Sequence, residues 1–182
     1  MTRLQAVNPE TATGKIKDLF NAVEKKLGMV PNMMRTMGNS VAVLNGYLSF
    51  SGALGESTIG ARLGEQIALA VAEADQCEYC LSAHTYIGGT LLGMEEATLS
   101  SSREAATGNA KTDAALVFAQ TLVRKKGLVT DEDVNKVRAA GYGDGEIAEI
   151  VAHTALNIFT NYLNNTAKTI VDFPRVELAA IV

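Results

Sequence analysis

The stretch Asp75-Gln-Cys-Glu-Tyr-Cys-Leu-Ser-Ala-His84 contains both cysteines of the 182-residue chain and one of its two histidines. Cys77, Cys80 and His84 follow the spacing i, i+3 and i+7. On a helix these positions lie on one face, stacked turn above turn. The stretch therefore predicts a helix along which two thiols and an imidazole share one stripe.

The expected start of this helix places the first cysteine where a thiolate is favoured. Asp75 is a suitable N-cap, and Glu78 three residues later completes a capping-box pattern. Cys77 then lies in the first turn, where free N–H groups and the helix dipole stabilise an anion, and the Cys-X-X-Cys spacing acts in the same direction. We expect one thiol of the pair to titrate below the ordinary value of about 8.5. Because the thiolate is the nucleophilic form, the pattern indicates a redox centre.

The composition is that of an ordinary globular protein, with 47% hydrophobic and 20% charged residues. At this length we expect a single domain over residues 1–182. The net charge is -4 and no basic cluster extends beyond Arg124-Lys-Lys126, so nucleic acid is not an expected partner. The sequence has no signal-peptide pattern and no run of about 18 apolar residues, so we expect a cytoplasmic protein with no membrane partner. There, a cysteine pair is more often catalytic, redox-active or metal-binding than a structural disulfide.

Apolar residues recur at helical spacing along most of the chain, and no stretch of useful length alternates between apolar and polar residues. The pattern predicts an all-α protein. Expected N-caps are Asn8, with Pro9 after it, Ser40 and Thr130. The apolar tail from Val176 to Val182 is expected to lie on a surface. The longer helices are expected at residues 8–28, 40–53, 58–74, 75–93, 111–126, 130–141 and 144–169.

Glu65 stands in the middle of one expected helix, between Gly64 and Gln66. A carboxylate in this position is most often solvated, and its spacing alone favours that interpretation. If its helix and the next fold back as a pair, however, Glu65 approaches the start of the cysteine helix. A carboxylate near a thiol can accept or return its proton.

The cysteine pair has three other interpretations. Both thiols can be small core residues, although the only two cysteines of a chain seldom fall three apart by chance. The pair with a histidine supplies three zinc ligands, and the fourth would be His153 or a carboxylate. A haem attachment needs a histidine directly after the second cysteine, where Leu81 stands. We expect neither a metal nor a cofactor.

A polar stripe runs along the last long helix, formed by His153, Asn157, Asn161 and Asn164. Such a stripe is most often the solvated face of a helix. The alternative is a contact between subunits made through amide hydrogen bonds, and the sequence leaves both open.

Glu65, Cys77, Tyr79-Cys80 and His84 together resemble the AhpD-like alkylhydroperoxidases of the carboxymuconolactone decarboxylase superfamily. Further segments resemble the peroxidase-related branch of that superfamily: Val30 to Asn32, Ala155 to Asn164, and Asp172 to Pro174. The resemblance therefore extends over most of the chain.

The resemblance implies an all-α fold around a central helical hairpin that carries the Cys-X-X-Cys helix, and a homo-oligomer such as a trimer or hexamer. It implies a peroxidase that reduces a hydroperoxide and is regenerated by a dithiol or lipoyl-type reductant. In these terms Cys80 is the peroxidatic thiol, Cys77 is the proton donor and resolving thiol, and His84 and Glu65 form a proton relay. The spacing of the residues supports part of this assignment, because His84 lies one turn from Cys80, where an imidazole can contact the thiol and take its proton.

One position departs from the family pattern. Tyr79 occupies the place where the best-characterised members have a histidine, which affects the rate, the substrate and the reductant more than the reaction class. A tyrosine, with a pKa of about 10, is a poorer proton shuttle near neutral pH. Two other functions stay open: an enzyme of the carboxymuconolactone decarboxylase type, and a non-enzymatic thiol redox sensor.

Overall fold

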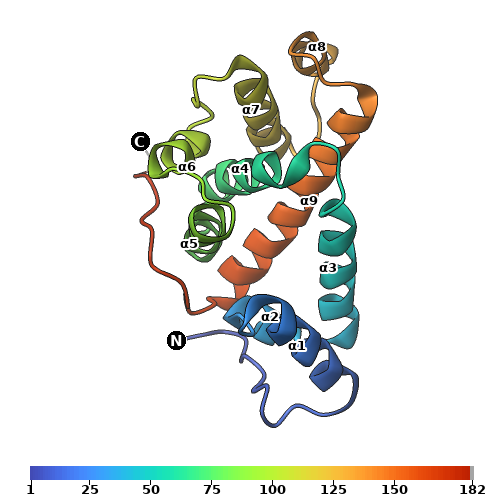
Figure 1. Ribbon diagram of the computed structural model, residues 1–182, viewed down its shortest axis with the longest axis vertical. Helices are drawn as coiled ribbons and strands as arrows, with labels where there is room; N and C mark the ends of the chain where they lie inside the picture. Colours follow the sequence, from blue (N-terminus) through green and yellow to red (C-terminus); the bar gives the residue numbers. More distant parts are fainter. Residues whose placement is uncertain (181–182) are drawn as a thin grey trace.

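The computed structural model describes residues 1–180, and within them it contains helices and no strand (Figure 1). The expectation of an all-α protein is confirmed. No helix in this part of the chain combines the length and apolar character needed to cross a membrane. The helices are α1 (Gly14–Leu27), α2 (Asn32–Met37), α3 (Val41–Leu54), α4 (Gly60–Ala74), α5 (Glu78–Tyr86), the π-helix η1 (Ile87–Leu91), α6 (Glu96–Arg103), α7 (Ala110–Lys125), α8 (Asp131–Ala139) and α9 (Asp144–Ala167).

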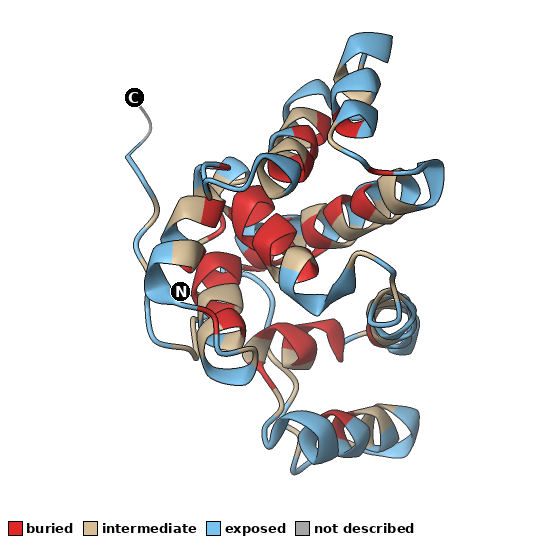
Figure 2. Ribbon diagram, turned by 45° about the horizontal axis from the view of Figure 1, so that its top comes forward, coloured by how far each residue is buried: buried red, intermediate tan, exposed pale blue. Residues whose placement is uncertain are grey.

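Helix α4 lies at the centre of the molecule and packs against α5, α6, α7 and α9. Every residue from Gln66 to Ala72 is buried, so the second half of the helix is enclosed on all sides, as is typical of a helix in the interior. Leu69 faces the core shared with α1, α2, α3 and α5, whereas Ile67 and Val71 face the core shared with α7, α8 and α9. Figure 2 shows the buried residues concentrated on these central helices. Helix α4 therefore joins the two halves of the core.

The turn between α4 and α5 forms the predicted helical hairpin. Gln76 has a left-handed backbone conformation with φ 52°, and the Cys77 N–H donates to Ala72 O at 2.9 Å. The expected helix start is wrong by two residues, because Asp75 is the C-cap of α4 and Cys77 is the N-cap of α5. The Asp75 carboxylate accepts a hydrogen bond from Asn161 Nδ2 at 3.0 Å, so it does not cap α5.

Two of the other expected helix starts are confirmed. Ser40 caps α3, and Thr130 and Asp133 form a reciprocal capping box at the start of α8. The start at Asn8 is wrong, since α1 begins at Gly14. Asn8 Oδ1 instead accepts from the Glu10 N–H at 3.0 Å, which closes a short turn of the kind that asparagine favours outside helices.

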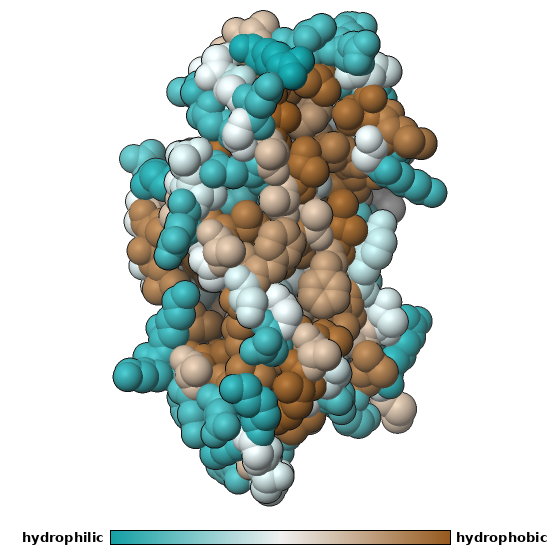
Figure 3. All heavy atoms as spheres, turned by 90° about the vertical axis from the view of Figure 1, so that its right-hand side faces the viewer, coloured by the Kyte–Doolittle hydropathy of each residue, from teal (hydrophilic) through white to brown (hydrophobic). Residues whose placement is uncertain are grey.

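An apolar face extends over α3 and α9, on the side of the molecule that Figure 3 presents. A shallow groove of about 320 Å³ lies between the two helices and is lined by Tyr47, Phe50, Leu156 and Phe159, among others. The large apolar side chains exposed on these helices are Val41, Phe50, Val151, Phe159 and Tyr162.

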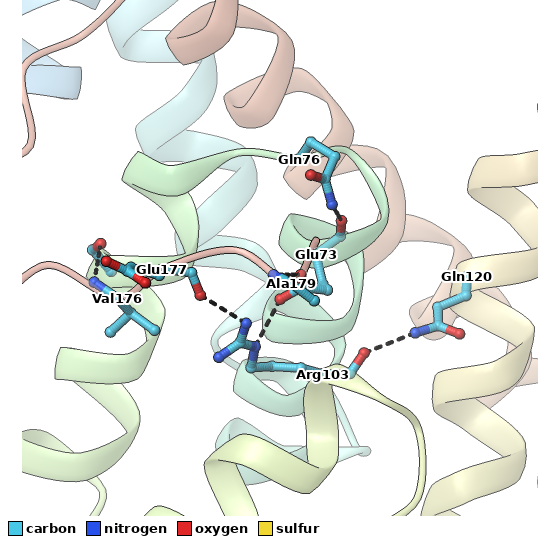
Figure 4. A network of polar contacts seen from close by, with 8 residues as sticks. Glu73, Gln76, Arg103, Gln120, Val176, Glu177 and Ala179 are labelled. Atoms are coloured by element: carbon cyan, nitrogen blue, oxygen red, sulfur yellow. Dashed lines mark hydrogen bonds and ion pairs between the residues drawn. The ribbon is translucent and has the colours of Figure 1, made fainter. Parts of the chain in front are cut away.

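The C-terminal tail returns beside α5 and ends near α6 (Figure 1). The Val176 N–H donates to Ser82 Oγ at 3.0 Å, and the Ala179 N–H donates to Glu73 Oε1 at 2.7 Å. Arg103 links the Glu73 carboxylate to the Glu177 carbonyl oxygen (Figure 4). The part of the apolar tail up to residue 180 thus lies on a surface of its own chain, as expected, and Ile181 and Val182 lie outside the described residues.

Candidate active site

The cysteine pair is buried at the start of α5. Cys77 is 0% exposed and Cys80 is 2% exposed, and both are free thiols. As the N-cap, Cys77 accepts a hydrogen bond at its Sγ from the Cys80 N–H at 3.3 Å. The first turn of α5 therefore brings the two thiols together, as the Cys-X-X-Cys spacing predicted.

Glu65 and His84 meet across the α4–α5 hairpin. Glu65 Oε2 lies 2.7 Å from His84 Nδ1, and each side chain is about one-fifth exposed. The interpretation of Glu65 as a solvated surface residue is therefore wrong. Burial lowers the pKa of His84, but the charge of Glu65 and hydrogen bonds with Glu65 and Asn157 outweigh it, so the pKa lies above its ordinary value. The paired carboxylate orients the imidazole and favours its protonated form.

The polar stripe of α9 covers the cysteines. Asn157, Asn161 and Asn164 are all buried, so the stripe is neither solvated nor left free for another subunit. Asn164 Nδ2 lies 3.2 Å from Cys80 Sγ, and Thr160, whose hydroxyl donates to Asn157 O, lies close enough to this thiol to affect its pKa. Sequence reasoning placed neither residue at the site. Their nearest signal is the polar spacing itself, which does not show what the helix packs against.

The surroundings of Cys80 favour the neutral thiol. Burial raises the pKa of Cys80 well above its ordinary value and the neighbouring Cys77 raises it further, whereas the hydrogen bond from Asn164 and the nearby Thr160 lower it. At Cys80 the loss of hydration outweighs the helix start. The expectation that one thiol of the pair titrates below its ordinary value stays a prediction. Residues 1–180 show no hydrogen bond between His84 and Cys80, since the imidazole pairs with Glu65 and Asn157.

A cavity of about 580 Å³ lies beside the cysteine pair. Cys80, Glu65 and His84 line it, while Cys77 does not. Most other lining side chains are apolar and come from α1, α3, α5, η1 and α9. Such a volume is typical of a small-molecule site. The lining residues that are themselves exposed, and so mark the mouth, include Lys26, Leu27, Met29, Tyr86 and Leu91.

Tyr79 and His153 line this cavity and connect the elements around it. The Tyr79 hydroxyl accepts from the Met33 N–H at 3.1 Å, its ring packs edge-on against Phe173 with centroids 5.8 Å apart, and burial raises its pKa far above the usual range. His153 Nε2 lies 3.0 Å from Ser57 Oγ, and the ring fits closely over α4 because Gly64 has no side chain. Tyr79 is thus a clamp between α5, α2 and the tail rather than a proton shuttle.

The geometry gives no support to the zinc interpretation. Among residues 1–180, no three histidine, cysteine, aspartate or glutamate side chains are grouped so that they can hold a metal ion. His153, considered as a fourth ligand, instead pairs with Ser57.

Fold and site together define an all-α protein with a buried Cys-X-X-Cys pair beside a glutamate–histidine pair. The structure is similar to an uncharacterized peroxidase-related protein from Silicibacter sp. TM1040, with a TM-score of 0.79, 25% identity and coverage of 93% of this chain and 94% of that one. It is also similar to a peroxidase-related protein from Ralstonia eutropha JMP134 described as an alkylhydroperoxidase AhpD core, with a TM-score of 0.82, 23% identity and coverage of 94% and 92%.

A third similar structure is the debrominase Bmp8, in a cysteine-to-alanine variant bound to 2,3,4-tribromopyrrole, with a TM-score of 0.79, 21% identity and coverage of 94% and 92%. No family model matches the chain, and no curated protein matches it by sequence. The resemblance to the AhpD-like proteins is confirmed at the level of the fold, which this chain shares with peroxidase-related proteins and with a debrominase.

Proposed function

We propose that the protein is a thiol-dependent peroxidase, formed by one domain, that reduces hydroperoxides through Cys80 and Cys77. The observation that supports this best is that Cys80, Glu65 and His84 line one cavity while Cys77 lies behind it. The arrangement gives the substrate access to one thiol and leaves the other to close a disulfide.

The reaction proceeds in two steps. The Cys80 thiolate attacks one peroxide oxygen, so that an S–O bond forms, the O–O bond breaks, and the alkoxide leaves with a proton as an alcohol. Cys77 then attacks the sulfur of the resulting sulfenic acid, which forms the disulfide and releases water. His84, oriented by Glu65, accepts the Cys80 proton, and Cys77 supplies the proton for the leaving alkoxide. An external dithiol or lipoyl-type reductant restores both thiols by exchange.

The size of the cavity supports an organic hydroperoxide as the substrate. Its volume of about 580 Å³ and its mostly apolar lining suit a molecule much larger than hydrogen peroxide. The proposed reaction consumes a dithiol reductant, which a reducing compartment supplies, and this agrees with a cytoplasmic location.

The apolar face over α3 and α9 supports a homo-oligomer. Phe50, Phe159 and Tyr162 are 40%, 39% and 58% exposed and lie on these two neighbouring helices. Large apolar groups gathered on one face are typical of an interface between chains. A trimer or hexamer would bury this face around a rotation axis.

Reductive dehalogenation of an aromatic compound is the second candidate, favoured by a cavity that holds Tyr47, Tyr79 and Phe173 beside Cys80. In this reaction the thiolate takes the halogen, the ring carbon takes a proton, and Cys77 displaces halide to close the disulfide. Two thiols are oxidised and one carbon–halogen bond is reduced, so the electrons balance.

The test is consumption of cumene hydroperoxide and of hydrogen peroxide by the purified protein with dihydrolipoamide as reductant. We expect many turnovers with the organic peroxide and loss of both thiols after one equivalent when the reductant is left out. A redox sensor would lose its thiols without turnover, and a decarboxylase would retain them. Bromide release from tribromopyrrole without peroxide consumption would favour the dehalogenase.

A further inference from the structure

The asparagine side chains of α9 have different partners. Asn157 donates to His153 O at 2.9 Å, Asn161 to Val71 O and the Asp75 carboxylate, and Asn165 to Asp75 O at 3.1 Å. Each of these amides therefore satisfies a backbone carbonyl and has a structural purpose. Asn164 differs, because the only hydrogen bond of its side chain among residues 1–180 runs from Nδ2 to Cys80 Sγ at 3.2 Å.

The burial of Asn164 does not stabilise the fold by itself. Asn164 is 2% exposed, and its Oδ1 has no hydrogen-bond partner within residues 1–180. An unpaired buried carbonyl destabilises the folded state, and a thiol is a weak acceptor for the amide. The contact becomes favourable when the sulfur is negative, because a donor binds a charged acceptor more strongly than a neutral one.

We propose that Asn164 is a positioning residue for Cys80, one that holds its sulfur at the cavity wall and stabilises its thiolate from α9. The proposal deepens the proposed function, since it assigns the group that makes a buried thiol reactive. Thr160, 4% exposed and one turn earlier on α9, lies beside the same sulfur but donates its hydroxyl hydrogen to Asn157 O at 3.0 Å, so the side-chain donor from α9 is Asn164. This donor acts against burial, which is the largest influence on the pKa of this thiol.

The titratable groups around the sulfur come from three helices. Cys77 and Tyr79 lie beside Cys80 in the sequence, Tyr47 of α3 interacts with its charge, and Glu65 of α4 and His84 of α5 line the same cavity. Cys77 is replaced by serine in every protein that is compared, and the other residues of this set are unchanged in all of them, so a difference in the Cys80 titration between the proteins reports the amide.

The experiment measures the rate of alkylation of Cys80 by iodoacetamide between pH 7 and pH 11. All proteins carry Cys77→Ser, so that Cys80 is the only thiol. Asn164→Leu removes the donor with little change in volume, and Asn164→Asp replaces it with an acceptor. Asn161→Leu is the matched control, because Asn161 is 0% exposed on the same helix and bonds to Val71 and Asp75 instead of sulfur.

We expect the pKa of Cys80 to rise by about one unit in Asn164→Leu, with alkylation at pH 8 about tenfold slower, and to rise further in Asn164→Asp. Asn161→Leu should lower the thermal midpoint and leave the titration unchanged. Equal titrations in all four proteins, or a shift in Asn161→Leu as large as in Asn164→Leu, would overturn the proposal. If Asn164→Leu does not fold, the isosteric Asn164→Asp decides alone. Iodoacetamide is not a peroxide, so this outcome does not depend on whether the protein turns over a hydroperoxide.

Discussion

At the scale of single residues, the two cysteines have different surroundings. Cys80 lines the cavity and accepts a hydrogen bond from Asn164 of α9, whereas Cys77 is the N-cap of α5 and does not line the cavity. Under the proposed function, access to the cavity favours Cys80 as the thiol that attacks the peroxide, because a thiolate that the peroxide cannot reach does not react.

The first prediction follows from this division of roles. In Cys77→Ser treated with one equivalent of peroxide, Cys80 should stop at sulfenic acid and be trapped by dimedone, because no second thiol can close the disulfide. Cys80→Ser should show little trapping at Cys77. Mass spectrometry of the labelled peptide measures both. The reverse labelling, with Cys77 trapped and Cys80 silent, would contradict the assignment.

The second prediction concerns Glu65 and His84. Glu65→Gln removes the charge that raises the pKa of His84 and leaves burial, so this pKa should fall below its ordinary value of about 6.5. Peroxidase activity should fall about 100-fold, the scale of lost general acid–base catalysis. NMR titration of the imidazole and steady-state rates measure the two effects. Glu149→Gln is the control, since that carboxylate accepts from Thr58 and Ile59 at the start of α4 and does not line the cavity.

The sequence indicated part of the candidate site and missed the rest for a physical reason. The spacing of Cys77, Cys80 and His84 follows from one helix, so local periodicity was enough to predict it. Glu65 required a folded hairpin, and the family resemblance supplied that. Asn164 and Thr160 approach Cys80 from a helix about 80 residues later, and their place depends on how α9 crosses α5, which no local pattern encodes.

At the scale of elements, α9 is amphipathic in the opposite sense to a usual surface helix. Its polar residues Thr154, Asn157, Asn161 and Asn164 are buried against the chain, while Val151, Phe159 and Tyr162 are exposed. Both interpretations that the sequence left open, a solvated face and a contact between subunits, assumed that the polar side chains point away from the core of the chain. The Thr154 hydroxyl and the amide Nδ2 groups of Asn157 and Asn161 donate to backbone carbonyls, which explains how the helix tolerates these donors, whereas the Oδ1 atoms of Asn161 and Asn164 have no partner within residues 1–180.

His153 joins the loop before α4 to α9. Its Nε2 faces Ser57 Oγ at 3.0 Å, it also bonds the backbone of Leu54, and burial lowers its pKa below the ordinary value. The unfolded chain therefore binds a proton more readily than the folded one does. As the pH falls below about 6.5, this difference destabilises the fold.

The third prediction combines the two histidines. The raised pKa of His84 contributes stability that is present below about pH 6.5 and is lost as the pH rises through the pKa of the folded state. His153 acts in the opposite direction, because its lowered pKa makes the fold less stable as the pH falls. Urea unfolding between pH 5.5 and pH 8 should therefore show a maximum of stability near pH 6.5. His153→Gln should reduce only the loss of stability below pH 6.5, and His84→Gln only the loss of stability above pH 6.5. Identical pH profiles for the wild type and both variants would contradict the assignment.

At the scale of the whole molecule, the order and approximate bounds of the helices could be predicted, because apolar periodicity and capping residues are local signals. Ser40 and Thr130 illustrate this. The errors at Asn8 and Asp75 share one cause: a side chain that can cap a helix had another partner, the Glu10 N–H in one case and Asn161 in the other. The path of the tail over Ser82 and Glu73 depends on tertiary contacts and had no local signal.

The last prediction concerns the apolar face of α3 and α9. Phe50 and Phe159 border the groove between these helices and are partly exposed, so a second copy of the chain that covers them removes apolar surface from water. Phe50→Glu and Phe159→Glu place a charge where association would have to desolvate it, which disfavours assembly strongly. Sedimentation velocity at micromolar concentration should show an oligomer for the wild type and monomer for both variants.

Leu128→Glu is the matched control for this measurement. Leu128 is 82% exposed in the turn between α7 and α8, so it tests the effect of one added carboxylate on an apolar site outside the α3–α9 face. Its sedimentation should equal that of the wild type. The groove also borders Tyr47, which lines the cavity of Cys80 as well, so assembly should change the reactivity of Cys80 in step with the loss of oligomer. A wild type that sediments only as monomer at micromolar concentration would contradict the homo-oligomer.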